Sequence, residues 1–169
     1  MTSLMPSAPR SKSAKRRRME AKLTFLLEDF PRLLTELDPS TPPAWGQMNV
    51  QQMVEHMTDA VLVAAGKIPV KLLSPENRLP QMVAFLFSDD PFPQNVKNPL
   101  MGETPAPVRN PNMETAIAEL KRALETIQQA FAENPEREIV NPFFGPLNYE
   151  GQVQLLHKHA KHHLKQFGV

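Results

Sequence analysis

Four of the five histidines in this 169-residue chain lie within a short stretch near its end, and the fifth lies about a hundred residues earlier. The four are His157, His159, His162 and His163, and the distant one is His56. Imidazole nitrogens are common metal ligands, and three on one ion leave coordination positions open for water or substrate. Cysteine is absent, which excludes disulfides, thiolate ligands and a cysteine nucleophile. The pattern therefore favours a metal site built from nitrogen and oxygen ligands.

The helical rotation of residues 148–168 separates the four clustered histidines. One helix is expected here, with a buried apolar stripe formed by Val153, Leu156, Ala160, Leu164 and Phe167. His159 and His163 share a face beside this stripe, one turn apart, and can converge on one ion. His162 is expected to point to solvent, and His157 lies on the other flank. Gln166 falls beside the face of His159 and His163, one turn later.

A second helix, expected over residues 49–65, carries the distant histidine. Asn49 and Gln52 match the pattern of a capping box, and Gly66 follows the last turn. His56 lies on the apolar side of this helix, which also carries Met53, Ala60 and Val63. A lone inward histidine is usually a satisfied core residue, but three imidazoles in one core would be costly unless uncharged and jointly coordinated. The alternative is a histidine-rich helix end that interacts with the helix dipole and solvent.

Two further amphipathic segments, about residues 19–37 and 112–132, bring the helices to four. Pro31 lies inside the first segment and can kink it or start a second piece. The connection from residue 66 to 111 holds nine of the 18 prolines and is expected to contain a short helix over residues 75–87, interrupted near Pro80. Residues 138–144 are expected to form a loop. The chain is therefore predicted to be an all-α four-helix bundle whose long crossover lets its second and fourth helices face each other.

The charge is uneven along the chain. The first 19 residues hold six lysines and arginines and no acid, which leaves 13 basic and 18 acidic residues in the remainder, a net charge of −5. We expect residues 1–18 to form a disordered solvating arm. Alternatively, this arm could contact nucleic acid or anionic lipid, or it could be a transit peptide. The chain lacks an apolar run long enough for a membrane span and the apolar centre of a secretory signal, so a cytoplasmic location is expected.

Several residues near the candidate ligands have two interpretations. Asp59 lies one turn after His56 and is either a base or supporting carboxylate for the site or merely a salt-bridge partner. Gln166 could orient an imidazole or form an ordinary bond at the helix end. Trp45, the only tryptophan, could stack on a substrate, although packing before the second helix is the favoured interpretation. Phe143 and Phe144 are expected to plug the bundle, with lining of a pocket mouth as the alternative.

Taken together, these residues resemble the DinB/YfiT-like superfamily of metal-binding four-helix bundles. The resemblance covers about residues 20–169 and, more narrowly, points to a branch catalogued as a domain of unknown function. Its motifs are PAWGQM at 43–48, QMVEH at 52–56, NPFFG at 141–145, HxxHHxxQ at 159–166 and HLKQFG at 163–168. The resemblance implies an up-down-down-up, DinB-like bundle over residues 19–169, with its crossover between the second and third helices. It also implies His56, His159 and His163 as the metal ligands, the same three that the helical rotation favours.

The resemblance implies two activities, metal-dependent hydrolysis and transfer of a small thiol. Both need a divalent ion, for which zinc or nickel is expected, with iron or copper as alternatives. The expected partner is a small-molecule substrate of unknown identity, and relatives often form homodimers. Two other hypotheses stand beside the enzyme. One is a metal-stabilised binding or regulatory module without catalysis, and the other is a nucleic-acid-associated protein that acts through the basic arm.

Overall fold

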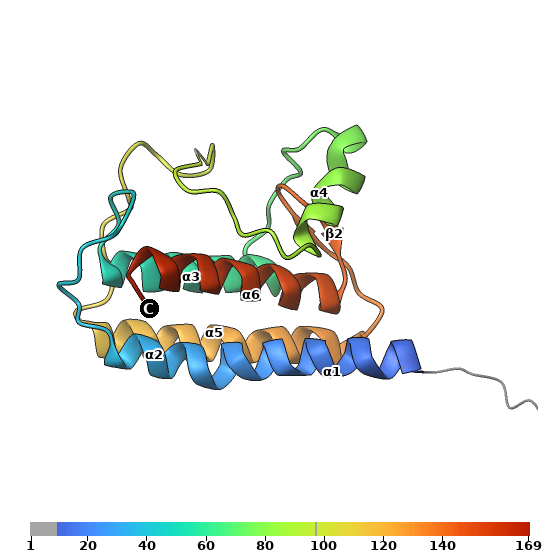
Figure 1. Ribbon diagram of the computed structural model, residues 1–169, viewed down its shortest axis with the longest axis horizontal. Helices are drawn as coiled ribbons and strands as arrows, with labels where there is room; N and C mark the ends of the chain where they lie inside the picture. Colours follow the sequence, from blue (N-terminus) through green and yellow to red (C-terminus); the bar gives the residue numbers. More distant parts are fainter. Residues whose placement is uncertain (1–9, 97) are drawn as a thin grey trace, which may run out of the picture.

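The computed structural model describes residues 10–96 and 98–169 (Figure 1). Four long helical segments lie side by side, and a crossover lies on one side of them. The four segments are α1 (Arg10–Thr24) with the π-helical turn η1 (Phe25–Asp29) and α2 (Phe30–Glu36), α3 (Val50–Ala64), α5 (Met113–Glu133) and α6 (Tyr149–Gln166). The remaining described elements are η2 (Glu76–Arg78), α4 (Leu79–Leu86), β1 (Ile139–Asn141) and β2 (Gly145–Leu147). The mostly helical fold predicted from the sequence is confirmed.

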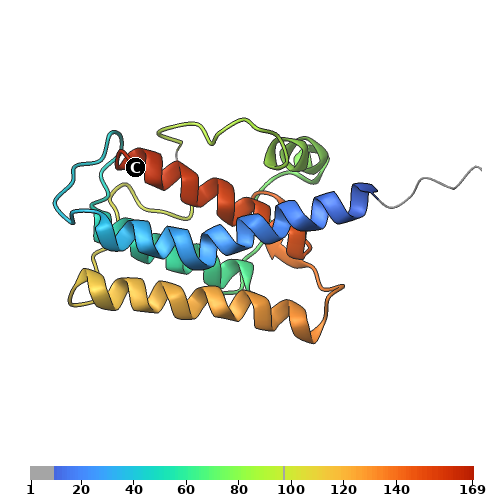
Figure 2. The ribbon, with the colours of Figure 1, turned by 60° about the horizontal axis from the view of Figure 1, so that its bottom comes forward.

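The crossover makes α3 and α6 neighbours. Figures 1 and 2 show α3 and α5 running in one direction and α1, α2 and α6 in the other. Residues of α3 contact both α5 and α6, while α1 contacts α6 and α2 contacts α5. In Figure 1 the chain between α3 and α5 runs above the layer formed by α3 and α6. The side of that layer away from the bundle interior is therefore the side that the crossover covers.

The first helical segment begins earlier than the sequence predicted. Its expected start was near Met19, after a disordered arm, whereas α1 begins at Arg10. Lys, Arg, Ala, Met and Glu are all good helix formers, and Arg16 pairs with Glu20 one turn later, which supports the helix. Residues 10–18 of the expected arm are therefore described as part of this helix. The rest of the predicted arm, residues 1–9, lies outside the described residues.

The break near Pro31 takes the form of a π-helical turn. The backbone N–H of Phe30 donates to the carbonyl of Phe25, five residues earlier, and Pro31 then lies in the first turn of α2. Proline lacks an N–H and its ring collides with the carbonyl four residues before it, so a wider turn removes the conflict. The segment continues as α2 beyond this turn and buries both Phe30 and Pro31.

Asparagine side chains begin the other three long helices. Asn49 and Gln52 form the predicted capping box of α3, with distances of 2.8 and 2.9 Å. Asn112 and Asn148 accept hydrogen bonds from backbone N–H groups in the first turns of α5 and α6. These caps place the starts of all three helices within a residue or two of their predicted positions.

Apolar side chains from all four segments meet in one core. Its fully buried members include Leu26, Phe30, Met53, Met57, Leu120, Ile127, Leu156 and Ala160. A second, smaller cluster joins α4 to the hairpin and to α6 and consists of Leu86, Phe144, Leu147 and Leu155. Phe144, expected to plug the bundle, is buried in this second cluster and is not a member of the main core. Among the described residues, no helix has both the length and the apolar character of a membrane span.

The segment before α6 forms a hairpin, so the predicted loop over residues 138–144 is wrong. Strands β1 and β2 pair antiparallel, with Ile139 opposite Leu147 and Asn141 opposite Gly145. The side chain of Asn141 accepts hydrogen bonds from the backbone N–H groups of Phe143 and Phe144, and Gly145 has a φ of 77°. An asparagine turn followed by a left-handed glycine reverses the chain in few residues. This local turn chemistry forms the hairpin despite its two prolines.

The crossover is fastened to α3 by one buried carboxylate. Glu55 is 4% exposed and accepts hydrogen bonds from the backbone N–H groups of Arg109 (2.6 Å) and Asn110 (3.4 Å), and from Gln51 (3.1 Å). The guanidinium of Arg109 in turn pairs with Glu119 of α5. The last residues of the crossover are thus held between α3 and α5. In the crossover itself the predicted short helix is present as η2 and α4, with Pro80 in the first turn of α4.

We expect Glu55→Ala to lower the free energy of unfolding by roughly 2–3 kcal/mol, because it removes the buried carboxylate to which two backbone N–H groups of the crossover donate. Urea unfolding measures the change. The matched control is Glu36→Ala, which removes an exposed carboxylate paired with Arg32 and should cost less than about 1 kcal/mol. Equal effects of the two substitutions would contradict the anchoring role of Glu55.

Candidate functional site

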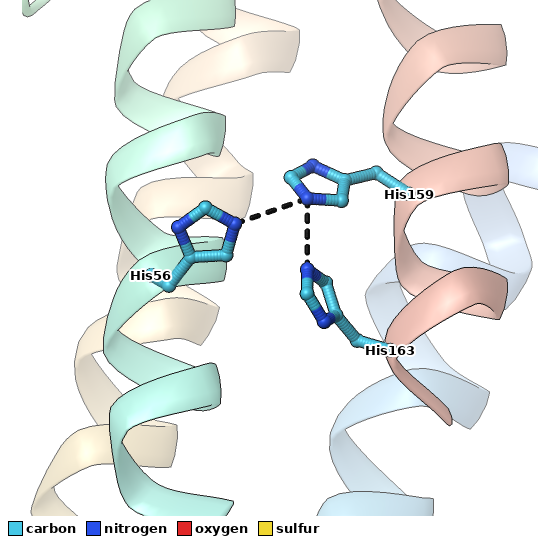
Figure 3. Close-up of side chains that lie close together, drawn as sticks. All are labelled: His56, His159 and His163. Atoms are coloured by element: carbon cyan, nitrogen blue, oxygen red, sulfur yellow. Dashed lines mark hydrogen bonds between the residues drawn. The ribbon is translucent and has the colours of Figure 1, made fainter. Parts of the chain in front are cut away.

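Three histidine rings meet between α3 and α6. His56 projects from the middle of α3, and His159 and His163 project from successive turns of α6 (Figure 3). The Nε2 atoms of His56 and His159 are 3.1 Å apart, and those of His163 and His159 are 2.9 Å apart. One nitrogen from each ring lies within 4.8 Å of the others. The structure therefore brings together the three residues that the sequence singled out.

The side chain of Gln166 determines which nitrogen of His163 carries the proton. The Nε2 of Gln166 lies 2.9 Å from the carbonyl oxygen of Trp45, which can only accept a hydrogen bond. Its Oε1 therefore faces Nδ1 of His163, at 2.8 Å, and that nitrogen must donate. In a neutral ring the Nε2 of His163 is then left with a lone pair. That lone pair points toward His159 and the centre of the cluster.

The contact between Gln166 and the chain before α3 needs a glycine. Gly46 has a φ of 74°, and a Cβ at this position would lie 3.2 Å from Nε2 of Gln166. The backbone N–H of Ala44 also donates to the carbonyl oxygen of Gln166, at 2.7 Å. The last turn of α6 is therefore fastened to the connection between α2 and α3. Of the two sequence interpretations of Gln166, the structure shows a direct contact with an imidazole.

Burial keeps the three rings uncharged. It lowers the pKa of His163 to about 3 and lowers the pKa of His159 well below the usual 6.5. The pKa of His56 is lowered by burial as well, although the nearby charge of Asp59 acts in the opposite direction. A protonated imidazole cannot ligate a metal, so rings that stay neutral near pH 7 are suited to the task.

The spacing of the nitrogens suits a metal ion. Zinc-to-nitrogen bonds of about 2.0–2.1 Å in a tetrahedral arrangement place two ligand nitrogens about 3.3 Å apart. Two of the three separations, 3.1 and 2.9 Å, differ from that value by a few tenths of an ångström, and all three nitrogens lie within 4.8 Å of one another. Three neutral imidazoles are also a donor set that divalent transition metals accept. The residues present therefore fit a single divalent ion.

The prediction that His162 points to solvent is wrong. Its ring is half-buried and lies 5.2 Å from the ring of Trp45 and 6.0 Å from the ring of Phe92. Trp45 and Phe92, from two different connections, cover this side of α6, and helical rotation does not place residues of connections. Trp45 therefore packs before α3, as favoured from the sequence, and its partner is a histidine beside the site.

His157 lies away from the cluster, as the rotation predicted. Its ring meets the edge of Phe25, with centroids 5.3 Å apart, on the side of α6 that faces η1. Burial, followed by the charges of Lys161 and Lys22, lowers its pKa to about 4. This histidine is thus part of the helix packing and does not reach the other three rings.

The nearest acidic side chains have other partners. Asp59 forms an ion pair with Arg109 at 3.1 Å, in agreement with the salt-bridge interpretation. Glu55 is occupied by the backbone of the crossover. Sequence reasoning missed Phe92, whose ring lies 5.9 Å from the ring of His159. Apart from its position between two prolines, nothing in the sequence marks Phe92, because its place depends on the path of the crossover.

Comparison with known proteins gives one family. The family model described as DinB superfamily matches residues 17–167, a range that includes all three clustered histidines and Gln166. No curated protein and no solved structure gave a significant match.

The lowered pKa values predict how the stability of the metal-free protein depends on pH. Above about pH 6.5 the rings are neutral in both folded and unfolded chains, so their burial carries no proton-linked penalty. Below this pH the unfolded chain binds protons that the folded protein does not, and stability falls until the folded pKa is reached, about 3 for His163. His163 is 4% exposed, and its share should amount to about 2 kcal/mol at pH 5.

Urea unfolding at pH 7.5, 6 and 5 measures this loss, and His163→Asn removes the share of one ring. The variant should be less sensitive to pH than the wild-type protein. If both lose the same stability between pH 7.5 and 5, His163 is not held neutral by burial.

Proposed function

Because the chain belongs to the DinB superfamily, and its three clustered imidazoles fit a divalent ion, we propose that it is a metal-dependent enzyme. His56, His159 and His163 are the proposed ligands. The proposed reaction is hydrolysis of a small molecule or transfer of a small thiol, and zinc or nickel is the expected ion. The observation that carries the proposal is the convergence of three Nε2 atoms in a place where none of the rings is charged.

The hydrogen bonds of the cluster support a metal rather than a purely structural role. Gln166 leaves the Nε2 of His163 as an acceptor, so in the metal-free protein only a proton on His159 can satisfy that contact. The same Nε2 of His159 also faces His56. A single proton serves both contacts poorly, since each hydrogen bond prefers a nearly linear donor. A cation at the centre would accept all three lone pairs.

Each residue of the site has a proposed task. The imidazoles hold the ion and remain neutral, and Gln166 fixes the orientation and tautomer of His163. When bound, a divalent ion with open coordination positions lowers the pKa of water or a thiol and so supplies a nucleophile. We assign no proton transfer to Asp59, because its carboxylate is paired with Arg109 and acts on His56 through its charge alone.

The first test is metal content. Protein purified without chelator or affinity-tag metal should contain about one divalent ion per chain by elemental analysis. Alanine substitution of His56, His159 or His163 should remove most of it, because two imidazoles hold an ion much more weakly than three. His157→Ala is the matched control and should keep full occupancy. Unchanged metal content in all three ligand variants would refute the ligand assignment.

Activity is tested with the metal-loaded protein. A panel of small esters and amides, and of electrophiles offered with a low-molecular-weight thiol, should reveal turnover that is lost on metal removal and in His163→Ala. If metal removal lowers the melting temperature and no compound is turned over, the protein is a metal-stabilised binding module.

The task of Gln166 has its own test. Gln166→Met removes the acceptor for Nδ1 of His163 and should weaken metal affinity by roughly 10- to 100-fold, the usual effect of losing a group that orients a ligand. Gln166→Glu keeps an acceptor and should retain more of the affinity. The exposed neighbour Lys165→Met serves as the control. Competition with a chromophoric chelator measures the metal affinity of all three variants. Equal metal affinity of Gln166→Met and the wild-type protein would exclude this role of Gln166.

A further inference from the structure

Lys158 is a buried cation next to a proposed metal ligand. The residue is 8% exposed and immediately precedes His159 in α6. Its Nζ donates hydrogen bonds to the carbonyl oxygens of Phe85 (3.0 Å), Ser88 (3.0 Å) and Asp90 (2.5 Å). In the part of the chain that the structure describes, no carboxylate forms an ion pair with it within 4.0 Å. All three donors of the ammonium are therefore used on the backbone of the crossover.

The position of these carbonyls explains how a buried charge is tolerated. Helix α4 ends at Leu86, so Phe85 and the residues after it carry carbonyls that have no partner within the helix. The C-terminal end of a helix is also its negative end, which favours a nearby cation. The Nζ of Lys158 lies 4.4 Å from the centre of the Phe85 ring, a further favourable contact for an ammonium. The ammonium of Lys158 thus binds backbone carbonyls from the end of α4 and from the residues that follow it.

The segment held in this way ends at the site. Phe92 follows Asp90 by two residues, and its ring is nearly perpendicular to those of His159 and His162, with centroids 5.9 and 6.0 Å away. The ring of Phe92 also lies beside the ring of Phe144, with centroids 6.4 Å apart. Most other hydrogen bonds within residues 85–90 are local, such as those between Ser88 and Phe85. Besides Lys158, α6 holds this segment through Gln154, which donates to the carbonyl of Leu86.

We propose that Lys158 is a positioning residue that holds Phe92 against the rings of His159 and His162 and thereby limits access to the three-histidine cluster. The significance of this role for substrate rests on the proposed function, because a wall beside His159 matters for chemistry only if that ring holds an ion. The role itself is a property of the chain and can be measured without metal.

The test compares Lys158→Met with Lys161→Met in metal-free protein. Methionine keeps an unbranched side chain but removes the ammonium, and Lys161 is exposed on the same helix. Amide hydrogen exchange of residues 85–92 should rise by about tenfold or more in Lys158→Met, since even one lost hydrogen bond to a charged group has this effect. Modification of His159 by diethyl pyrocarbonate, followed by mass spectrometry, should accelerate by a similar factor. In Lys158→Met, His157 should be modified at the wild-type rate. In the Lys161→Met control, both amide exchange and the modification of His159 should stay at the wild-type rates.

Wild-type exchange and wild-type reactivity of His159 in Lys158→Met would overturn the proposal. If that variant does not fold, Phe92→Ala gives a second test, because it removes the ring and leaves the hydrogen bonds of Lys158 in place. It should raise the reactivity of His159 without raising exchange at residues 85–90, and an unchanged reactivity would also overturn the proposal. Since both readouts use metal-free protein, absence of metal binding would count against the proposed function alone.

Discussion

The arrangement depends on keeping three imidazoles uncharged while they face one another. Their nitrogens lie 2.9 and 3.1 Å apart, a spacing at which two protonated rings would repel strongly. Burial between α3 and α6 favours the neutral form of the rings. The rings are buried there because the long crossover makes α3 and α6 neighbours. The anchors of the crossover, Glu55 at its end and Lys158 near its middle, therefore support the site although neither belongs to it.

Helix α6 serves several partners at once because its faces are divided among them. Val153, Leu156 and Ala160 enter the main core, while His159 and His163 face α3. Gln154 and Lys158 hold the end of α4. This division explains why so much of the helix is buried, including glutamine and lysine side chains that would usually be exposed. Each buried polar group here bonds to a backbone carbonyl or a neighbouring side chain, with Oε1 of Gln152 as the exception among the described residues.

Helical periodicity predicted the parts of the molecule that depend on local sequence. The capping box of α3 follows from its local motif, and the approximate bounds of α3, α5 and α6 and the grouping of His56 with His159 and His163 follow from spacing and rotation. The surroundings of His162 could not be predicted this way, because Trp45 and Phe92 come from connections whose paths no periodic pattern describes. The hairpin escaped prediction because it depends on one asparagine turn, and the start of α1 escaped prediction because its first residues are mostly basic and carry no apolar stripe.

Gln166 links His163 to the backbone at Trp45 from the last turn of α6. Leu164 and Phe167, on either side of Gln166 in this turn, are buried in the main core, so the end of α6 is packed against the bundle. A shift of the backbone at Trp45 therefore reaches the ring of His163 through one side chain. The chain before α3 and the lone pair of His163 are coupled in this way, although Trp45 and His163 are more than a hundred residues apart in the sequence.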